Sequence, residues 1–353
     1  MSARAALLLL GLALAAPAPG QDAPPAPAPK QPPPPAPKES PAPARLEERS
    51  FEGGVMGTSL QITVLGPDVE VLERALREAV AELRRVEDEF TTWRPSPLTR
   101  LNDRAGQGPQ RCSHEAVVLI GRSLEVSELT HGAFDVTFYS VGKLWDFKAK
   151  PPKLPSKEEV AAALRAVGYQ KVKVDPERDT IELPAGTKIG LGGIAKGYGV
   201  DRAMALIMKL GIRHAVVNAG GDLKALGKKH GQPWEIAIKH PRERDKVLAV
   251  LPVSNVCVVT SGDYERFFEH EGKRYHHILD PRTGYPSEGC MSATVTAPDA
   301  AFADALATAM CVLGPVEGLK VIDALPRVEA ILVGLDGKVH FSKGLRRAAP
   351  PGN

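Results

Sequence analysis

Apolar and polar positions follow two different periods in the part of the chain after residue 46. In SLQITVL, Leu60, Ile62 and Val64 alternate with other residues, which is the period of a half-buried strand. From Leu72 to Val86, apolar residues recur every three to four positions, which is the period of a helix with one buried face. The pattern therefore predicts a strand that leads into a long amphipathic helix.

Capping and turn residues predict the later elements. Ser156 and Glu159 have the spacing of a capping box before a helix, and VKVDPERDTIEL predicts a hairpin. The apolar runs HAVVN, WEIAI, VLAVLPV and VCVVT predict strands, and a hairpin with the turn HEGK follows them. After the strand ATVTA we expect a helix over Ala301–Leu313, a second helix from Pro315, and a final hairpin that turns at Asp336–Gly337. Hairpins dominate and helices are grouped between them, so we predict an α+β fold of antiparallel sheets with packed helices.

The N-terminus has the composition of an export signal. Arg4 precedes an apolar run, Ala5–Ala16, which is too short for a hydrocarbon layer of about 30 Å and ends in small residues and prolines. We predict that residues 1–20 are a cleaved secretory signal peptide and that the protein is exported to a periplasmic or other extracytoplasmic compartment. The alternative is an uncleaved segment that keeps the chain weakly associated with a membrane. Because the first cysteine is Cys112, we expect no lipid anchor on an N-terminal cysteine.

Composition also divides the rest of the chain. Residues 21–45 are mostly proline and alanine, which favour extended polyproline II, so we predict a solvated, disordered tether. Residues 46–346 contain no second proline-rich break and are predicted to form one domain, with a disordered tail at 347–353.

Charge and cysteine content exclude some functions. The formal charge of +3 is small for 353 residues and no block of lysine or arginine stands out, so nucleic-acid binding has no electrostatic support. The four cysteines contain no CxxC pair, which argues against a zinc ribbon or a thioredoxin-type redox pair. Buried free thiols and a disulfide both remain open for them.

Polar side chains concentrate in TSGDYERFFEHEGKRYHHILDPRTGYP, the segment Thr260–Pro286. His276 and His277 fall in a predicted strand with alternating faces, so only one of them can point into a shared site. An imidazole with an ordinary pKa of about 6.5 is suited to accept a proton at neutral pH. A structural histidine is the alternative, although the polar residues DPRT that follow favour a functional one.

A candidate metal site lies further along. Asp304 and Thr308 are one helical turn apart in ADALATAM, so in a helix their carboxylate and hydroxyl project from one face and can together hold a hard cation. The alternative for Asp304 is that it begins the helix, but Thr308 lies too far inside the helix for that role.

Two glycine-rich segments are candidates for binding an anion. The glycines of GLGGIAKGYGVD precede a predicted helix, where free backbone amides attract phosphate, and Lys196 adds positive charge. The segment matches neither the dinucleotide fingerprint nor a Walker A loop, so a tight turn is the alternative. Asn218–Leu223, NAGGDL, forms either an anion-binding nest or a simple turn, and we interpret Asp222 as a capping residue rather than a catalytic one.

Together these segments resemble the ApbE-like FAD:protein FMN transferases, also called flavin transferases. The resemblance covers nearly all of the chain after the tether, and the motifs that carry it are, in order, VMGTSLQITV, TTWRPSPLTRLN, GAFDVTF, GGIAKGYGVD, NAGGD, TSGDYERFF, HHILDPRTGYP and DALATA. Several separate motifs in one order are far more specific than any single motif. The resemblance implies a T-fold-related single catalytic domain over residues 46–346.

The resemblance also implies a reaction and a set of site residues. In a Mg²⁺-dependent step, FAD is cleaved at its pyrophosphate, FMN is attached through a phosphoester to a threonine or serine hydroxyl of a partner protein, and AMP is released. His277 is implied as the catalytic residue, and a backbone carbonyl at Gly193 is implied to bind the metal together with Asp304 and Thr308. The residues implied to line the FAD site are Met56, Trp93, Ala133, Phe134, Asp135, Lys196 and Ile278. The flat face of Trp93 suits stacking on a ring of FAD, and ordinary core packing is the alternative for Met56 and Trp93.

The chain departs from the family pattern in three places. Gly190 in KIGLGG stands where many members carry an aspartate, which leaves one FAD contact open. VTFYSVGKLW replaces the usual proline and GPL stretch after Asp135, so we expect a pocket of different shape there. The usual lipid-attachment cysteine is missing.

Two other functions share all of these motifs. One is a Mg²⁺-dependent FAD pyrophosphatase, in which water replaces the protein hydroxyl and the products are FMN and AMP. The other is a non-catalytic flavin-binding carrier. For the transferase, the family suggests periplasmic subunits of membrane redox complexes or flavin-bearing extracellular reductases as acceptors, and nothing in the sequence chooses between them.

Overall fold

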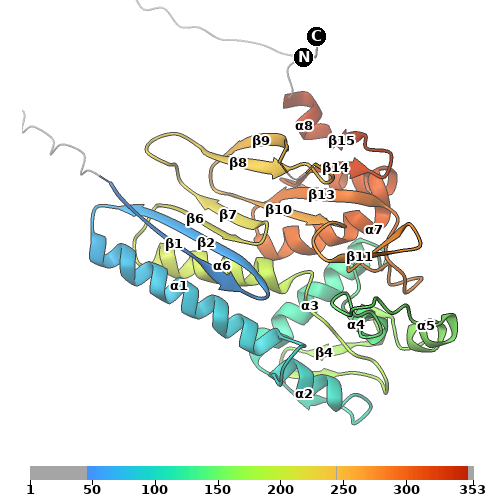
Figure 1. Cartoon of the computed structure of the whole chain (residues 1–353). Coiled ribbons are helices and arrows are strands. Elements are labelled where there is room, and N and C mark those ends of the chain that lie inside the picture. Colours follow the sequence, from blue (N-terminus) through green and yellow to red (C-terminus); the bar gives the residue numbers. More distant parts are fainter. Residues whose placement is uncertain (1–45, 244, 349–353) are drawn as a thin grey trace, which may run out of the picture. The chain divides into compact units, whose positions relative to one another are not determined.

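An antiparallel sheet of eight strands forms the centre of the fold (Figure 1). The computed structural model describes residues 46–243 and 245–348, so the predicted signal peptide and tether lie outside the described residues. The strand order is β1-β2-β6-β7-β10-β13-β14-β15, and every neighbouring pair is antiparallel. The strands are β1 (Glu47–Val55), β2 (Thr58–Gly66), β6 (His214–Ala219), β7 (Asp222–Leu226), β10 (Val256–Gly262), β13 (Cys290–Ala297), β14 (Glu329–Gly334) and β15 (Val339–Phe341). The predicted α+β fold with antiparallel sheets is confirmed.

Three helices cover one face of this sheet (Figure 1). They are α1 (Val69–Phe90), α6 (Ala195–Lys209) and α7 (Ala300–Ala324), and α6 contacts both of the others. Of the apolar face predicted for α1, Leu72, Ala79, Leu83 and Val86 are each 1% exposed or less, and Leu76 is half-buried. Full burial of a leucine or valine side chain contributes about 1.5–3 kcal/mol, so this face holds α1 against the sheet and α6.

Helix α7 consists of two helical segments joined at Gly314. Gly314 has φ 74° and ψ 177°, outside the helical region, and Pro315 begins the second segment. The break agrees with the prediction of one helix that ends at Leu313 and another that starts at Pro315. Among the described residues, α7 is the helix long and apolar enough to cross a membrane, but it packs against β10, β13 and α6. Its apolar composition is therefore that of a core helix.

A hairpin of β8 (Trp234–Lys239) and β9 (Val247–Val253) covers the opposite face of the central sheet. Trp234 packs there with Leu223 and Val258 of the sheet. The neighbours of Val258 in β10 belong instead to the core beneath the helices, because alternate residues of a strand face opposite sides. The middle of the sheet is thus buried on both faces.

A region of shorter elements lies between α1 and α6 in the sequence and contacts α1 and α7 (Figure 1). Ser156 and Glu159 make both hydrogen bonds of the predicted capping box at the start of α5. The elements of this region are α2 (Pro97–Asp103), β3 (Gln110–Arg111), α3 (His114–Leu129), η1 (Val136–Phe138), α4 (Tyr139–Gly142), α5 (Lys157–Leu164), η2 (Tyr169–Lys171), β4 (Lys173–Asp175) and β5 (Thr180–Glu182).

A second hairpin, β11 (Phe267–His270) and β12 (Lys273–His276), packs on this region. The rings of Phe268 and Tyr275 stack at 5.3 Å between centroids and at 15°, and Tyr275 stacks in turn on Trp145 at 5.9 Å. This aromatic cluster fixes the hairpin in position. At the end of the described chain, α8 (Lys343–Ala348) includes the first two residues of the segment predicted as a tail, and the rest of that segment lies outside the described residues.

All four cysteines lie in the described part of the chain and are free thiols. Cys257, Cys290 and Cys311 are buried, and Cys112 is half-buried. Burial raises the pKa of Cys257 and of Cys290 to about 12, so these side chains are protonated and unreactive at neutral pH. Of the two possibilities left open by the sequence, the structure contains the free thiols.

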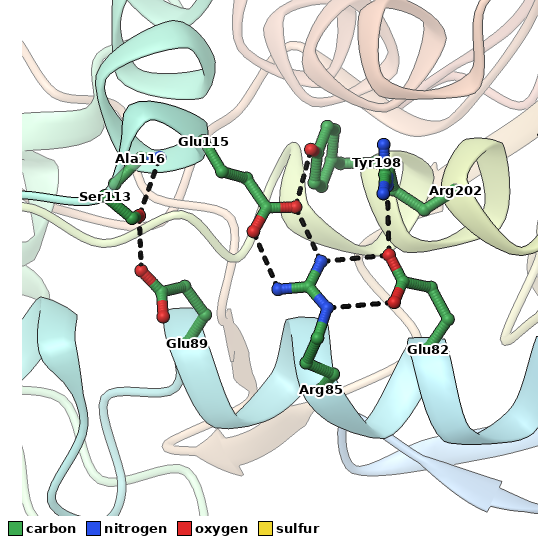
Figure 2. A network of polar contacts seen from close by, with 8 residues as sticks. All are labelled: Glu82, Arg85, Glu89, Ser113, Glu115, Ala116, Tyr198 and Arg202. Carbon is green, nitrogen blue, oxygen red and sulfur yellow. Dashed lines mark hydrogen bonds and ion pairs between the residues drawn. The ribbon is translucent and has the colours of Figure 1, made fainter.

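A network of charged side chains joins α1, α3 and α6 (Figure 2). Arg85 of α1 donates to both carboxylate oxygens of Glu82, at 2.8 and 2.9 Å, and to both of Glu115 on α3, at 2.7 Å. On α6, the hydroxyl of Tyr198 donates to Glu115 at 2.7 Å and Arg202 donates to Glu82 at 2.9 Å. The hydrogen bond from Arg85 lowers the pKa of Glu82 to about 2, so the network is fully charged at neutral pH. It fixes the orientation of α6, whose first turn reaches the candidate active site.

Candidate active site

One cleft of about 490 Å³ brings together the polar segments that stand out in the sequence. Its walls are the β1–β2 turn, the end of α1, the segment before η1, the loop before α6, the end of β10, the residues after β12, and α7. Every site residue implied by the family resemblance lines it: Met56, Trp93, Ala133, Phe134, Asp135, Gly193, Lys196, His277, Ile278, Asp304 and Thr308. The chemical role of each residue stays a prediction.

Lys196 lies between two buried carboxylates in the wall of this cleft. Its Nζ is 3.2 Å from Oδ2 of Asp222, and 3.2 and 3.3 Å from the two carboxylate oxygens of Asp304. The backbone N–H of Gly197, in the first turn of α6, also donates to Asp304 at 3.2 Å. Asp222 and Asp304 are 1% and 0% exposed, so neither carboxylate is solvated and both depend on these partners.

When all three groups are ionised, the charges of Lys196, Asp222 and Asp304 do not sum to zero. Burial raises the pKa of Asp222 well above its ordinary value, and the neighbouring Asp304 raises it further. Burial alone would lower the pKa of Lys196, but the two carboxylates reverse this and raise it above its ordinary value. With all three groups ionised, the cluster carries one surplus negative charge in surroundings that solvate it poorly. A bound cation would compensate this charge.

The oxygen atoms beside the cluster suit a hard divalent cation. Thr308 lies one turn after Asp304 on α7, and its Oγ1 is 3.5 Å from Oγ of Ser261. A Cβ built at Gly193 would stand 2.9 Å from Oγ1 of Thr308, so the close approach of this backbone requires glycine. Carboxylate, hydroxyl and carbonyl oxygens are the protein ligands that Mg²⁺ prefers. No three His, Cys, Asp or Glu residues form a metal-binding group within 46–243 and 245–348, so a cation here needs the hydroxyl and the backbone as well.

His277 directly follows β12 and lines the cleft. Its Nδ1 is shielded from solvent and has no hydrogen-bond partner among the described residues. Desolvation lowers the pKa of His277 to about 3, and the positive charge of Arg266 contributes to the shift. The imidazole is therefore neutral at pH 7, and its Nδ1 remains without a partner. His276 points away from the cleft, where its Nε2 is 2.9 Å from the carbonyl oxygen of Ser287, so the prediction that only one of the two histidines faces the site is confirmed.

Met56 and Gly57 form the two-residue turn between β1 and β2. Their φ angles are 51° and 71°, and a positive φ is uncommon for a residue other than glycine. The backbone N–H of Met56 donates to Oε2 of Glu87 on α1 at 2.8 Å, which holds the turn over the cleft. Met56 is 7% exposed, so it both lines the cleft and packs in the core. Trp93 is 60% exposed at the rim, so core packing is the wrong interpretation for Trp93.

Asp135 lines the cleft, but its carboxylate is engaged by the protein itself. Oδ1 accepts hydrogen bonds from the backbone N–H of Thr137 at 2.8 Å and from its hydroxyl at 2.6 Å, and Oδ2 accepts from the N–H of Tyr169 at 2.9 Å. These contacts cap η1 and tie it to η2. They place Ala133 and Phe134 on the cleft wall.

The segment VTFYSVGKLW supplies an aromatic part of the wall. Its residues Phe138, Tyr139 and Trp145 line the cleft together with Phe147, which follows the segment, and the rings of Trp145 and Phe147 stack at 6.2 Å and 8°. The Nε1 of Trp145 donates to the carbonyl of Gly284 at 3.0 Å, which fixes the indole. The segment at which we expect a departure from the family pattern therefore lies in the candidate site.

The capping role predicted for Asp222 is wrong, and two residues that line the cleft were not predicted from the sequence. Asp222 caps no helix: it is the first residue of β7, and its carboxylate pairs with Lys196. Ser261 and Arg266 also line the cleft. The feature of the sequence that marks Asp222 is its place directly after two glycines. These glycines have φ of 63° and 97° and form the turn between β6 and β7.

The model of the ApbE family matches residues 56–332. The chain belongs to the ApbE family. Curated relatives named FAD:protein FMN transferase include one from Haemophilus influenzae, 33% identical over 287 residues that make up 78% of this chain and 83% of the relative. Another, from Treponema pallidum, is 33% identical over 321 residues, 85% of this chain and 88% of the relative.

Solved structures of ApbE proteins have the same fold. The crystal structure of the ApbE protein from Thermotoga maritima has a TM-score of 0.79 and 34% identity, and covers 86% of this chain and 100% of that one. The flavin transferase ApbE from Vibrio cholerae has a TM-score of 0.76 and 30% identity, with 86% and 99% coverage. The family expected from the sequence is confirmed, and membership makes this ApbE-family chain an enzyme of the transferase class.

Proposed function

We propose that this ApbE-family enzyme is a Mg²⁺-dependent FAD:protein FMN transferase. A threonine or serine hydroxyl of an acceptor protein attacks the phosphorus atom on the FMN side of the FAD pyrophosphate. A phosphoester forms, the bond from that phosphorus to the bridging oxygen breaks, and AMP leaves with the electron pair. The proton of the hydroxyl passes to a base of the enzyme. The names of the curated relatives support both FAD and a protein acceptor.

The observation that carries this proposal is a neutral imidazole in the same cleft as a buried anionic cluster. A hydroxyl is a poor nucleophile until its proton is removed, and His277 lines the cleft with an unprotonated ring whose Nδ1 has no hydrogen-bond partner among the described residues. When Asp222 and Asp304 are both ionised, their two negative charges exceed the single positive charge of Lys196, and the cluster then favours a bound cation. A phosphoryl transfer needs both a base and a source of positive charge at one phosphate.

The residues that would hold Mg²⁺ are Asp304, Thr308 and the backbone carbonyl at Gly193. When bound, Mg²⁺ supplies positive charge to the phosphate oxygens and offsets the charge that develops on the leaving phosphate. Lys196 keeps the Asp304 carboxylate oriented through two contacts of 3.2 and 3.3 Å. The aromatic wall and the exposed ring of Trp93 offer flat surfaces for the rings of FAD.

We also propose that the enzyme acts outside the cytoplasm. The support is the N-terminal sequence, in which a basic residue, a short apolar run and small residues precede a proline-rich stretch. An acceptor would then be an exported protein, such as a periplasmic subunit of a redox complex. Fractionation of cells that produce the full-length chain tests this, and recovery of the unprocessed chain from the cytoplasm would contradict it.

A three-way assay tests the reaction. Purified enzyme is incubated with FAD, Mg²⁺ and a periplasmic redox subunit that exposes a threonine, and the products are followed by intact mass, in-gel flavin fluorescence and AMP chromatography. We expect covalent FMN on the acceptor and an equal amount of AMP, both lost with EDTA. Free FMN and AMP with an unlabelled acceptor indicate a pyrophosphatase instead, and bound FAD without AMP indicates a carrier.

A further inference from the structure

One positively charged side chain that lines the cleft is not paired with any described residue. Two basic side chains with a permanent charge line it, Lys196 and Arg266. Lys196 is committed to two carboxylates at 3.2 Å. The guanidinium of Arg266 has neither an ion pair nor a hydrogen bond to any of the described residues, although Glu265 precedes it in the chain.

Arg266 and His277 lie opposite each other at the open end of the hairpin β11–β12. Phe267 and His276 are paired across the two strands, so Arg266 and His277 are the next opposed positions. Their backbones are joined there, because the N–H of His277 donates to the carbonyl of Arg266 at 3.0 Å. Opposed residues of an antiparallel pair direct their side chains to the same face, and both side chains line the cleft.

Arg266 also reaches across the cleft. Its Nη2 lies 3.4 Å from the position that a Cβ would occupy on Gly57, in the β1–β2 turn, which also lines the cleft. The guanidinium therefore spans the gap between the hairpin that carries His277 and the turn that carries Met56. The guanidinium carries five N–H donors, and none of them bonds to a described residue.

Two neighbouring arginines differ from Arg266 because their guanidinium groups are paired. Arg242 donates to both oxygens of Asp263 at 2.7 Å, and Arg274 pairs with Glu269 at 3.1 Å and lies over the ring of Phe267 at 4.1 Å. Neither lines the cleft. Of these three arginines in the described part of the chain, Arg266 is the one that is unpaired and lines the cleft.

We propose that Arg266 binds the diphosphate of the dinucleotide beside His277 and holds the phosphorus under attack within reach of this base. A guanidinium matches phosphate oxygens with two parallel hydrogen bonds, and its charge next to His277 also helps to keep that imidazole unprotonated. The inference rests on the proposed function, because it takes FAD as the substrate. It adds an anion-binding residue to the candidate site, beside His277.

The test compares FAD with riboflavin, which has the same flavin ring but no phosphate. Dissociation constants of both are measured by flavin fluorescence for the wild type, Arg266→Gln and Arg266→Lys. Since the Arg266 side chain is exposed and supports no other residue, Arg266→Gln should fold normally. We expect Arg266→Gln to weaken FAD binding about 10-fold with little change for riboflavin, and Arg266→Lys to lose less. The decline of FAD affinity with salt should also become shallower.

Arg274→Gln is the matched control, since it removes the same charge from the same hairpin outside the cleft. It should leave the ratio of the two dissociation constants at the wild-type value. An unchanged ratio in Arg266→Gln overturns the proposal, as does a loss of FAD affinity equal to the loss of riboflavin affinity. A raised KM for the acceptor protein alone would assign Arg266 to acceptor binding instead. A wild-type protein that binds no FAD would instead remove the proposed function, and the role of Arg266 with it.

Discussion

Substitution of Gly197 by alanine should separate the two helices that build the charged cluster. A Cβ at Gly197 would stand 2.2 Å from the carbonyl oxygen of Ala300, 2.5 Å from its carbonyl carbon and 2.8 Å from the nitrogen of Ala301. All three atoms are backbone at the start of α7, so no side chain can rotate away. Unstrained contact requires about 3.5 Å, and α6 and α7 must therefore move apart by about 1 Å at this point.

Two opposing terms set the size of the effect. Overpacking of a core typically costs about 1–3 kcal/mol and more where the neighbour is backbone, whereas alanine is favoured over glycine inside a helix by about 1 kcal/mol. We expect a net loss of about 2 kcal/mol in the free energy of unfolding. The N–H of Gly197 would also move away from Asp304, which it reaches at 3.2 Å in the wild type. Metal affinity should therefore fall together with stability.

Urea unfolding followed by circular dichroism measures this loss, and Mn²⁺ titration calorimetry measures the second effect. Gly192→Ala is the control, because a Cβ at Gly192 meets no heavy atom within 4 Å and its φ is not positive. The control should unfold within about 0.5 kcal/mol of the wild type. A Gly197→Ala variant as stable as Gly192→Ala would refute the close approach of α6 and α7 and the placement of Lys196 beside Asp304 that depends on it.

Three further predictions concern charged groups of the cleft. His277→Gln should retain FAD, as measured by flavin fluorescence, but release no AMP. Because the pKa of His277 is about 3 in the folded protein and about 6.5 when unfolded, wild-type stability should fall as the pH drops from 6.5 towards 3, and His277→Gln should lose less stability in urea over that range. Asp222→Asn leaves one carboxylate beside Lys196 and removes the surplus charge, so we expect higher thermal stability but weaker Mn²⁺ binding; lower stability with unchanged metal affinity would contradict this charge balance. Asp304→Ala should raise the Mg²⁺ concentration needed for transfer about 10-fold or more, and an unaltered Mg²⁺ titration counts against its role.

Elements encoded by local chemistry could be predicted from the sequence. The capping box of α5 depends on residues three apart, and the β11–β12 turn depends on Glu271 and Gly272, which adopt φ of 50° and 74°. Strand β1 gives no such signal. Its burial pattern does not alternate and only Val55 at its end is buried, so its extended conformation follows from pairing with β2 rather than from its own residues. An edge strand of this kind cannot be predicted from its own sequence without knowledge of the strand that pairs with it.

The same distinction applies to the candidate site. Asp304 and Thr308 are one turn apart on a single helix, so their spacing alone predicted a shared face. Asp222 meets Lys196 only because β7 lies beside β6 and beneath α6, and the sequence does not specify that order of strands. The sequence likewise does not show that Arg266 is unpaired. This follows only from the structure, in which Arg242 pairs with Asp263 and Arg274 pairs with Glu269.

Gly190 and Tyr139, which lie in the two segments of the cleft wall where we expect a departure from the family pattern, are in close steric contact. A Cβ at Gly190 would stand 3.0, 3.1 and 3.2 Å from three atoms of Tyr139, which is tighter than ordinary contact, so a larger side chain there requires this ring to shift. Tyr139 begins α4 within the segment that differs from the family, and both residues line the cleft. The wall therefore lacks a carboxylate at Gly190 and presents an aromatic ring in its place. Less negative charge and more flat surface both favour a ligand that joins aromatic rings to phosphates, because the phosphates meet less repulsion and the rings gain a face to stack on.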